Sequence, residues 1–221
     1  MMELKKVGFA GAAFLSIFVI AGARTSGQLQ QRPADEYLKA MDNPDRDLKV
    51  DEVISKLRLK PGNIVADIGS GSGSFSIPMA KAIAPNGTLY AVDIDQKMLD
   101  FVADKAKKAG VTNLRTVLGE FDDPKLPARD VDLAFINDVL HHIQNRAVYL
   151  KALAHYIKPS GRIAIIEMNK DDPKTPHRNQ PELLVSRDEI TSWMADAGFK
   201  LVEEHADLFP GTRWYLIFGH R

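Results

Sequence analysis

Short apolar runs alternate with stretches of helical periodicity from Asp47 to the end of the 221-residue chain. The runs are bounded by turn-forming residues, which is typical of strands, and the stretches between them are long enough for helices. This alternation predicts a doubly wound α/β sheet, mostly parallel, with helices on both faces. The expected strands are Ile64–Ala66, Leu89–Val92, Leu114–Leu118, Val131–Ile136, Ile163–Ile166, Phe199–Val202 and Trp214–Phe218.

The same periodicity predicts the helices and the direction of the last strand. The last two strands are separated only by Glu203–Arg213, which is too short for a crossover helix, so they should pair antiparallel. Helices are expected at Asp47–Leu57, Phe75–Ile83, Asp95–Ala109 and Ile143–Ile157, and after a capping box formed by Ser186 and Glu189.

Composition narrows the class of protein. The chain has 29 Lys and Arg against 29 Asp and Glu, so it lacks the broad positive field with which proteins hold nucleic acid. It has no Cys, which excludes disulfides, thiolate metal sites and Cys nucleophiles. A hydrophobic share of 45% is ordinary for a folded domain, and we expect one domain over residues 47–221.

The N-terminal residues form a separate segment. Lys5 and Lys6 precede the uncharged, largely apolar run Val7–Ala23, in which small residues flank Gly22. This pattern predicts an export signal cleaved after residue 23. The alternative is an uncleaved membrane anchor, because 17 residues lie at the lower limit of about 17–25 for a transmembrane helix. Residues 24–46 are then a linker and an N-terminal helical segment.

A glycine-rich turn follows the first expected strand. Gly69, Gly71 and Gly73 leave room for a ligand to approach the backbone, and the next helix points its N-terminus there. Asp67 precedes this turn. Asp93 ends the second strand twenty residues after Gly73, a spacing at which a carboxylate can accept hydrogen bonds from ribose hydroxyls. The turn therefore predicts a nucleotide or nucleoside site.

Two kinds of nucleotide ligand compete for this turn. The dinucleotide pattern of an NAD(P)-binding oxidoreductase requires glycine where this chain has Ser74. Asp67 would also repel a pyrophosphate, whereas it suits a cationic ligand such as S-adenosylmethionine, which carries an ammonium and a sulfonium. The sequence favours the methyl donor over the dinucleotide and over a purely structural loop.

Five motifs in order resemble those of class I S-adenosylmethionine-dependent methyltransferases: Asp67–Gly73, Ala91–Asp95, Gly119–Phe121, Val131–Ile143 and Leu153–Glu167. The resemblance extends from about Leu48 to Arg221 and is strongest to the small-molecule branch that includes ubiquinone and menaquinone biosynthesis methyltransferases. It implies a Rossmann-like, seven-stranded sheet with the last strand antiparallel, and S-adenosylmethionine as the cofactor.

The resemblance also implies the roles of individual residues. The carboxylate before the glycine turn would face the methionine ammonium, and the one ending the second strand would hold both ribose hydroxyls. An apolar residue would cover the adenine, and Glu120 would accept from its amino group. Alternatively, Asp93 shares a helix-capping role with Asp95, and Glu120 is a solvated loop charge. The cofactor-binding residues implied are Asp67, Gly69, Ser70, Gly71, Gly73, Asp93, Ile94, Glu120, Phe121 and Asn137.

Two adjacent histidines, His141 and His142, follow the fourth expected strand and are the candidate catalytic residues. Histidine titrates near neutral pH and suits a general base that takes a proton from the methyl acceptor. Neighbours in a helix diverge by about 100°, so we expect one ring to face the site and the other to point away. Alternatively, both are helix-start histidines bonded to the backbone.

A second polar group ends the fifth strand. Glu167 and Asn169 are followed by a proline-containing loop with His177, Arg178 and Asn179, which we interpret as a lid or an acceptor-recognition segment, or else as a plain surface loop. Glu167 and Asn169, together with Asp138, offer oxygen ligands for a divalent cation, but we predict no metal site.

The acceptor is predicted by exclusion. The segment Asn137–Leu140 lacks the Pro-Pro-aromatic pattern of enzymes that methylate amino groups of DNA bases or glutamine, and no cysteines are present for arsenite. A small organic or lipid-like acceptor remains, and the apolar N-terminus adds possible membrane association. Export fits poorly with a cofactor made in the cytosol. Three alternatives are therefore kept: an uncleaved anchor that holds the domain on the cytosolic face, an exported domain that uses cofactor imported from elsewhere, and a non-catalytic S-adenosylmethionine-binding module.

Overall fold

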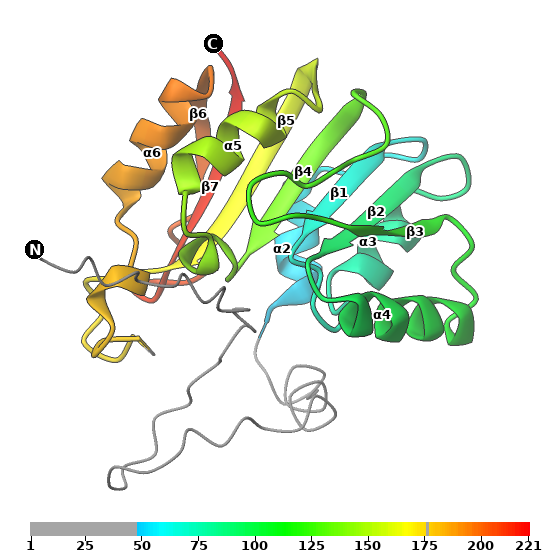
Figure 1. Cartoon of the computed structure of the whole chain (residues 1–221), viewed down its shortest axis with the longest axis horizontal. Coiled ribbons are helices and arrows are strands. Elements are labelled where there is room, and N and C mark those ends of the chain that lie inside the picture. The colour runs from blue at the N-terminus through cyan, green and yellow to red at the C-terminus, as the bar shows by residue number, and fades with distance from the viewer. Residues whose placement is uncertain (1–47, 176) are drawn as a thin grey trace, which may run out of the picture.

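The computed structural model describes residues 48–175 and 177–221. Seven strands of this part form one sheet, with the bounds β1 Ile64–Ile68, β2 Thr88–Asp93, β3 Leu114–Leu118, β4 Val131–Asn137, β5 Ile157–Met168, β6 Phe199–Glu204 and β7 Arg213–His220. Their order is β3-β2-β1-β4-β5-β7-β6 (Figure 1). Only β7 runs antiparallel to its neighbours, β5 and β6. The predicted sheet is confirmed, including its antiparallel last strand.

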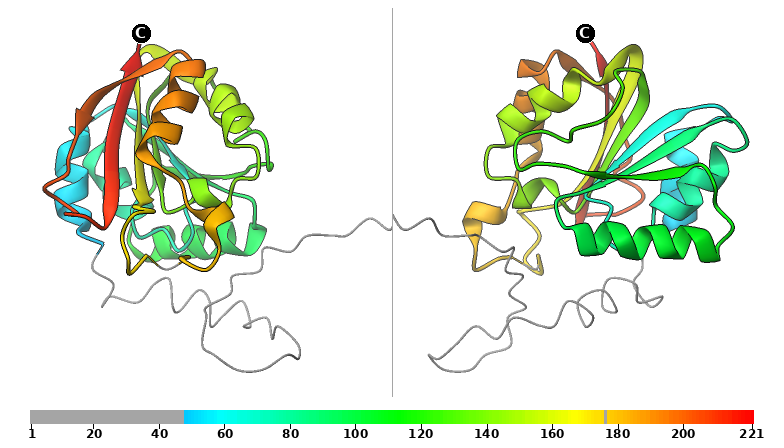
Figure 2. Two further views of the ribbon diagram at one scale, coloured as in Figure 1. Left: turned by 90° about the vertical axis from the view of Figure 1, so that its left-hand side faces the viewer. Right: turned by 45° about the vertical axis from the view of Figure 1, so that its right-hand side comes forward.

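Helices cover both faces of the sheet, as Figure 2 shows. The helices α2, α3 and α4 lie on one face, and α5 and α6 lie on the other. Asp95 caps α4 through the backbone N–H of Lys97, and the Ser186–Glu189 capping box begins α6, both as predicted. The bounds are α2 Val50–Leu57, α3 Ser76–Ala82, α4 Gln96–Lys108, α5 Arg146–Ala154 and α6 Arg187–Asp196, with 3-10 turns η1 Leu140–His142 and η2 Pro181–Leu183.

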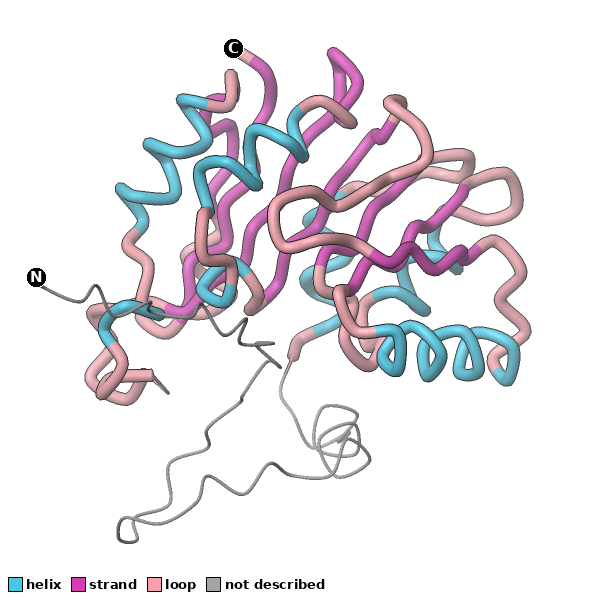
Figure 3. Tube along the Cα trace, viewed as in Figure 1, coloured by secondary structure: helices cyan, strands magenta, loops and turns pink. Residues whose placement is uncertain are grey.

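A hydrophobic cluster lies on each face of the sheet. Leu150 and Ile190 anchor α5 and α6 on one face, and Val53, Met79 and Val102 anchor the other three helices on the opposite face. All five side chains are fully buried. Burial of each contributes about 1.5–3 kcal/mol, so the two clusters fix the strand ends on which the long loops are carried. Those loops, residues 119–130 and 169–186, stand out in Figure 3.

Two expected elements have other bounds. The helix expected at Ile143–Ile157 is the shorter α5, because Ile143 is extended and Ile157 already pairs with Val131 in the sheet. The strand expected at Ile163–Ile166 is longer, and residues 158–161 bulge out of its ladder with β4. Gly161 permits this bulge, since a Cβ there would lie 2.7 Å from the Val131 carbonyl oxygen.

The predictions for the export signal or membrane anchor, and for residues 24–46, lie outside the described residues. Among residues 48–175 and 177–221, no helix has the length and apolar character needed to cross a membrane.

Candidate functional site

Polar side chains gather at the carboxyl ends of the central strands. Strand order reverses between β1 and β4, and ligands of such sheets bind outside the strand ends at that point. Asp67 is the penultimate residue of β1, while Asp93 and Asn137 end β2 and β4. The structure therefore brings these three expected cofactor-binding residues to one edge of the sheet, the lower edge in Figure 1.

The glycine loop after β1 has the backbone that only glycine adopts readily. Gly69, Gly71 and Gly73 have φ values of 69°, 50° and 73°. The Gly69 N–H donates to the Val92 carbonyl at 2.8 Å, which holds the loop against β2. A Cβ at Gly69 would lie 2.3 Å from Val139 Cγ2, so the loop also packs directly on the turn after β4.

Asp93 ties the glycine loop to the start of α4. Its Oδ2 accepts from the Gly71 N–H at 3.0 Å and its Oδ1 accepts from the Asp95 N–H at 3.1 Å. Partial burial raises the pKa of Asp93, although both backbone hydrogen bonds counteract this. The N-cap itself is Asp95, whose carboxylate accepts from Lys97. Asp93 is therefore not the helix cap, and its carboxylate stands where β2 meets the loop.

Asp67 is a buried carboxyl group with only 4% of its surface exposed. Burial raises its pKa to about 7, the Ser76 hydroxyl that donates to Oδ2 lowers it, and the nearby charge of Asp93 raises it further. Ser70 is also buried, and its Oγ has no hydrogen-bond partner among the described residues. The loop thus combines an ionisable carboxyl with an unsatisfied hydroxyl, two groups that a polar ligand would satisfy.

Apolar side chains flank Asp93 on the solvent side. Ile94 is 42% exposed and Phe121 is 64% exposed, which is unusual for large hydrophobic residues on adjoining loops. Glu120, between the strand end and Phe121, is paired with Lys125 (Oε2–Nζ, 3.2 Å). These positions are consistent with the expected arrangement, in which apolar side chains cover the adenine and a carboxylate beside them accepts a hydrogen bond from its amino group. The role of Glu120 stays a prediction.

His141 forms a buried pair with Glu167. His141 Nδ1 lies 2.8 Å from Glu167 Oε1, and the two side chains are 3% and 1% exposed. The backbone N–H groups of His141 and Met168 also donate to the same carboxylate, at 3.1 and 2.8 Å. A carboxylate at Nδ1 holds the proton there and leaves Nε2 as the ring atom that can accept another.

Arg146 holds the histidine turn against the loop after β5. Its guanidinium donates to the carbonyls of Leu140 at 3.1 Å and His141 at 2.9 Å, both in η1. It also donates to the Glu182 carbonyl in η2, at 3.0 Å. The side chain stacks over Trp193, with Cζ 5.8 Å from the ring centre. Arg146 therefore fixes the distance between η1 and the 169–186 segment.

The two adjacent histidines have different environments, as expected. The His142 ring lies 3.9 Å from the His141 ring, centre to centre, and is the more exposed of the two. The His177 ring is 5.3 Å from that of His141, so the 169–186 segment reaches the pair. Partial burial and the neighbouring His141, His177 and Arg146 lower the pKa of His142, which keeps its ring neutral. Arg178 and Asn179 follow in the same segment.

The oxygen groups considered for a cation are engaged by protein partners. Asp138 pairs with Arg213 (Oδ2–Nη2, 3.0 Å), and Glu167 is held as described. The Asn169 amide donates to the Gly211 carbonyl at 3.0 Å. In the part of the chain that the structure describes, no group of three or more His, Asp or Glu is arranged to hold a metal ion.

Sequence reasoning missed three partners at this edge. Ser76 starts α3 and bonds to Asp67, and the alternating serines of the loop hinted at such a role. The sequence places Glu167 in the polar group at the end of the fifth strand but does not predict its contact with His141, and no pattern singles out Arg213. Glu167 meets His141 across 26 residues and Arg213 meets Asp138 across 75, so no local pattern marks either contact.

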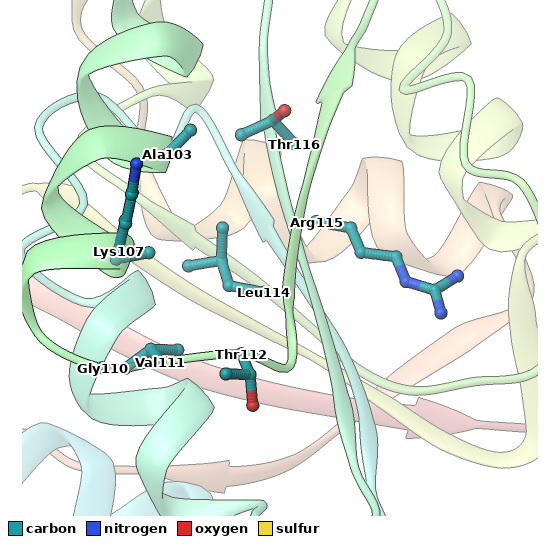
Figure 4. Close-up of a pocket in the computed structure, with 9 residues that line it drawn as sticks. Ala103, Lys107, Gly110, Val111, Thr112, Leu114, Arg115 and Thr116 are labelled. Carbon is teal, nitrogen blue, oxygen red and sulfur yellow. The ribbon is translucent and has the colours of Figure 1, made fainter.

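A separate hollow of about 410 Å³ lies between α4 and β3. Figure 4 shows Lys107 and Leu114 on the same side of the strand, while the Arg115 guanidinium points away from them. The hollow includes Gly110–Thr112, at the amino end of β3. It therefore lies at the opposite end of the sheet from the glycine loop and is not part of the candidate site.

Known proteins resemble this chain over most of the described domain. The chain is 31% identical over 117 residues to a demethylmenaquinone methyltransferase of Lactobacillus johnsonii, covering 52% of this chain and 48% of the relative. It is 27% identical over 113 residues to the ubiquinone/menaquinone biosynthesis C-methyltransferase UbiE of Ectopseudomonas mendocina, covering 51% and 44%. The chain thus spans about half the length of these two relatives.

A solved structure matches more completely. The crystal structure of a SAM-dependent methyltransferase from Aquifex aeolicus has a TM-score of 0.73 and 26% identity, covering 83% of this chain and 96% of the other. The sequence profile of the methyltransferase domain family matches residues 59–198. These findings confirm the expected family and S-adenosylmethionine as its cofactor, in preference to a dinucleotide. The chain belongs to the methyltransferase domain family.

Proposed function

We propose that the domain transfers a methyl group from S-adenosylmethionine to a small organic or lipid-like acceptor, with His141 as the general base. The observation that carries this proposal is the buried pair of Glu167, on β5, with His141, which follows the turn that packs against the glycine loop. A ring held by a buried carboxylate beside a donor site is arranged to take a proton rather than only to fill space.

The residues at the edge of the sheet fit the cofactor. The positive φ values of the glycine loop open a cradle, and the unsatisfied Ser70 hydroxyl and buried Asp67 carboxyl offer partners for the methionine end. Asp93 would hold the ribose, while Ile94 and Phe121 would cover the adenine and lose their exposure. When bound, S-adenosylmethionine supplies a methyl group already activated by its sulfonium.

The chain's own contribution is alignment and proton removal. The glycine loop and the two aspartates fix the donor, so that the acceptor needs only to be held in line with the methyl group. His141, oriented by Glu167, would use its Nε2 to take the proton that the methyl acceptor loses. Partial burial lowers the pKa of His142, so its neutral ring adds no positive charge that would oppose protonation of His141. Because a histidine base can remove a proton only from a weakly acidic group, the proposed methyl acceptor is a hydroxyl of this kind or the ring carbon that such a hydroxyl activates.

The names of two relatives suggest the chemical class of the acceptor. One is named a demethylmenaquinone methyltransferase and the other a ubiquinone/menaquinone biosynthesis C-methyltransferase. An aromatic diol with an apolar tail combines a weakly acidic hydroxyl with a lipid-like body. The apolar run Val7–Ala23 supports a membrane-resident acceptor. We propose that this run either anchors the domain at a membrane or, as an export signal, directs it across one and is then removed.

The test is methyl transfer from labelled S-adenosylmethionine to a panel of acceptors. The panel holds hydroquinones with and without an isoprenoid tail, the tailed ones in lipid vesicles, together with simple phenols and amines. We expect label on the hydroquinones and phenols and little on the amines. Tight cofactor binding without transfer to any acceptor would instead favour a non-catalytic binding module. Failure to bind the cofactor would contradict the proposal altogether.

The raised pKa of Asp67 predicts that cofactor affinity depends on pH. Below about pH 7 the ligand-free carboxyl is protonated and must ionise to pair with the cofactor's ammonium. Affinity should therefore rise by roughly tenfold between pH 6 and 7.5, a range in which an α-ammonium stays largely charged. Calorimetric titration at both pH values measures the effect.

The matched control is Asp67→Asn, which cannot ionise. This variant should bind S-adenosylmethionine more weakly at pH 7.5 and lose most of the pH dependence of binding.

The raised pKa of Asp67 also has a consequence for folding. Because the folded protein keeps this proton to a higher pH than the unfolded chain does, the free energy of unfolding without cofactor falls as pH rises toward about 7. An unchanged pH dependence in the Asn variant would show that another group is responsible.

A further inference from the structure

We infer that the ion pair between Asp138 and Arg213 positions the turn between the donor and acceptor halves of the site. This inference rests on the proposed function, but it concerns residues that no cofactor or acceptor role has been assigned to. Asp138 lies between Asn137, at the end of β4, and Val139, which packs on Gly69. Any movement of this residue therefore moves both neighbours.

The backbone of Asp138 needs support. Its φ is 53°, in the left-handed region. This conformation costs free energy for every residue except glycine, and among the other residues Asn and Asp adopt it most readily. Its N–H donates to the Ile166 carbonyl on β5 at 2.9 Å. One backbone hydrogen bond and an unfavourable conformation are a weak basis for a turn that must stay in place, so a side-chain contact is expected to hold it.

Arg213 provides that contact from the first residue of β7. Its Nη2 lies 3.0 Å from Asp138 Oδ2 and its Nε lies 3.3 Å from Oδ1, a two-point contact that fixes the carboxylate in direction as well as distance. The side chains are 26% and 17% exposed, so solvent screens the pair only in part. The Arg213 guanidinium also stacks over Phe209, with Cζ 5.6 Å from the ring centre.

The position of Arg213 explains how the ion pair can affect His141 and Glu167. Arg213 is opposite Met168 in the antiparallel pairing of β7 with β5, one residue beyond Glu167. The pair therefore joins the strand that carries Glu167 to the turn that leads to His141. A displacement of about 1 Å at a reacting group can lower the rate by about 100-fold. Loss of the ion pair should therefore lower the rate of methyl transfer more than it lowers the affinity for S-adenosylmethionine.

The experiment compares three single variants and one double variant. Asp138→Ala removes the carboxylate and also disfavours the left-handed backbone, whereas Asp138→Gly removes the carboxylate but adopts this backbone freely. Arg213→Met removes the charge and keeps the length of the side chain. Arg213→Met is made in the parent and again in the Asp138→Gly protein, so that the coupling between the two positions is measured.

We expect kcat of Asp138→Ala to fall by about 100-fold, and kcat of Asp138→Gly to fall less but still clearly below the parental value, because the Gly variant loses the ion pair while it adopts the left-handed backbone freely. Arg213→Met should lower kcat in the parent and have little further effect in the Asp138→Gly protein. The Kd for S-adenosylmethionine should change by a smaller factor than kcat, because Asp67 and Asp93 are on other strands and only Asn137 and Gly69 adjoin the turn. A parental kcat in Arg213→Met or in Asp138→Gly, or an undiminished effect of Arg213→Met in the Asp138→Gly protein, would overturn the inference.

Hydrogen exchange makes the test independent of an acceptor. In Arg213→Met, amides of residues 137–142 should exchange faster, while those of β1 and β2 keep the parental rate. Thermal unfolding checks that each variant folds, and Asp138→Asn replaces the Ala variant if that one does not. If the parent transfers no methyl group but Arg213→Met still exchanges faster at residues 137–142, the proposed function is rejected and the inference stands. Unchanged exchange at residues 137–142 would reject the inference.

Discussion

Replacing Glu167 by glutamine is expected to lower kcat by about 100-fold or more, because the orientation and tautomer of a catalytic histidine depend on its carboxylate partner. In the parent, Oε1 accepts from His141 Nδ1 and Oε2 accepts from the His141 backbone N–H. The amide of glutamine can satisfy only one of these donors, so the ring loses its fixed proton position. Single-turnover transfer from labelled cofactor measures the change.

The binding of cofactor separates this effect from misfolding. Glu167 contacts no expected donor-binding residue, so the Kd for S-adenosylmethionine should remain within about threefold of the parental value. The free energy of unfolding should fall by about 1–3 kcal/mol, because a buried donor loses its partner. His142→Gln is the matched control, since His142 has no place in the proposed proton transfer. A Glu167→Gln protein with parental kcat would contradict His141 as the base.

Replacing Asp93 by alanine is expected to weaken binding of S-adenosylmethionine by about 100-fold or more. Hydrogen bonds to a charged group contribute about 1.5–3 kcal/mol each, and the carboxylate would accept two from the ribose. The variant also releases the Gly71 N–H, so the glycine loop loses one of its ties. Isothermal titration with S-adenosylmethionine measures the loss.

Asp95→Ala is the control for general damage to this region. Asp95 caps α4, so its loss should cost about 1 kcal/mol of stability, yet it leaves the Asp93 carboxylate in place. We expect near-parental affinity in this variant. Competition with adenosine, which keeps the ribose, should show the same loss in Asp93→Ala as the full cofactor does. A protein lacking Asp93 that binds as tightly as the parent would disprove the ribose assignment.

The parts of the fold that depend on local patterning could be predicted from the sequence. Apolar runs gave the strands, because central parallel strands are buried on both faces, and Asp95 and the Ser186–Glu189 pair marked helix starts correctly. The glycine turn was recognisable because left-handed backbone there requires residues without a Cβ. The prediction failed where tertiary contacts decide, as in the bulge at residues 158–161, which arises because Ile157 pairs with Val131 while Arg162 pairs with Leu133.

The candidate site could be predicted only on its donor side. Asp67, Asp93 and the glycines are close enough in the chain for spacing to be informative. The acceptor side depends on contacts between distant residues, and no spacing links His141 to Glu167 or Asp138 to Arg213. Two equal histidines in the sequence become different in the structure because only one of them meets the buried carboxylate.

The contact between Gly69 and Val139 has a consequence for how such a protein can diversify. Nearly all expected donor-binding residues precede β4, and the candidate acceptor groups follow it, with Asn137 at the boundary. The turn after β4 therefore lies between the proposed donor-binding half of the site and the proposed acceptor half. If the 169–186 segment recognises the acceptor as proposed, substitutions there should change the acceptor range with little effect on cofactor affinity, as long as Val139 keeps its contact with Gly69.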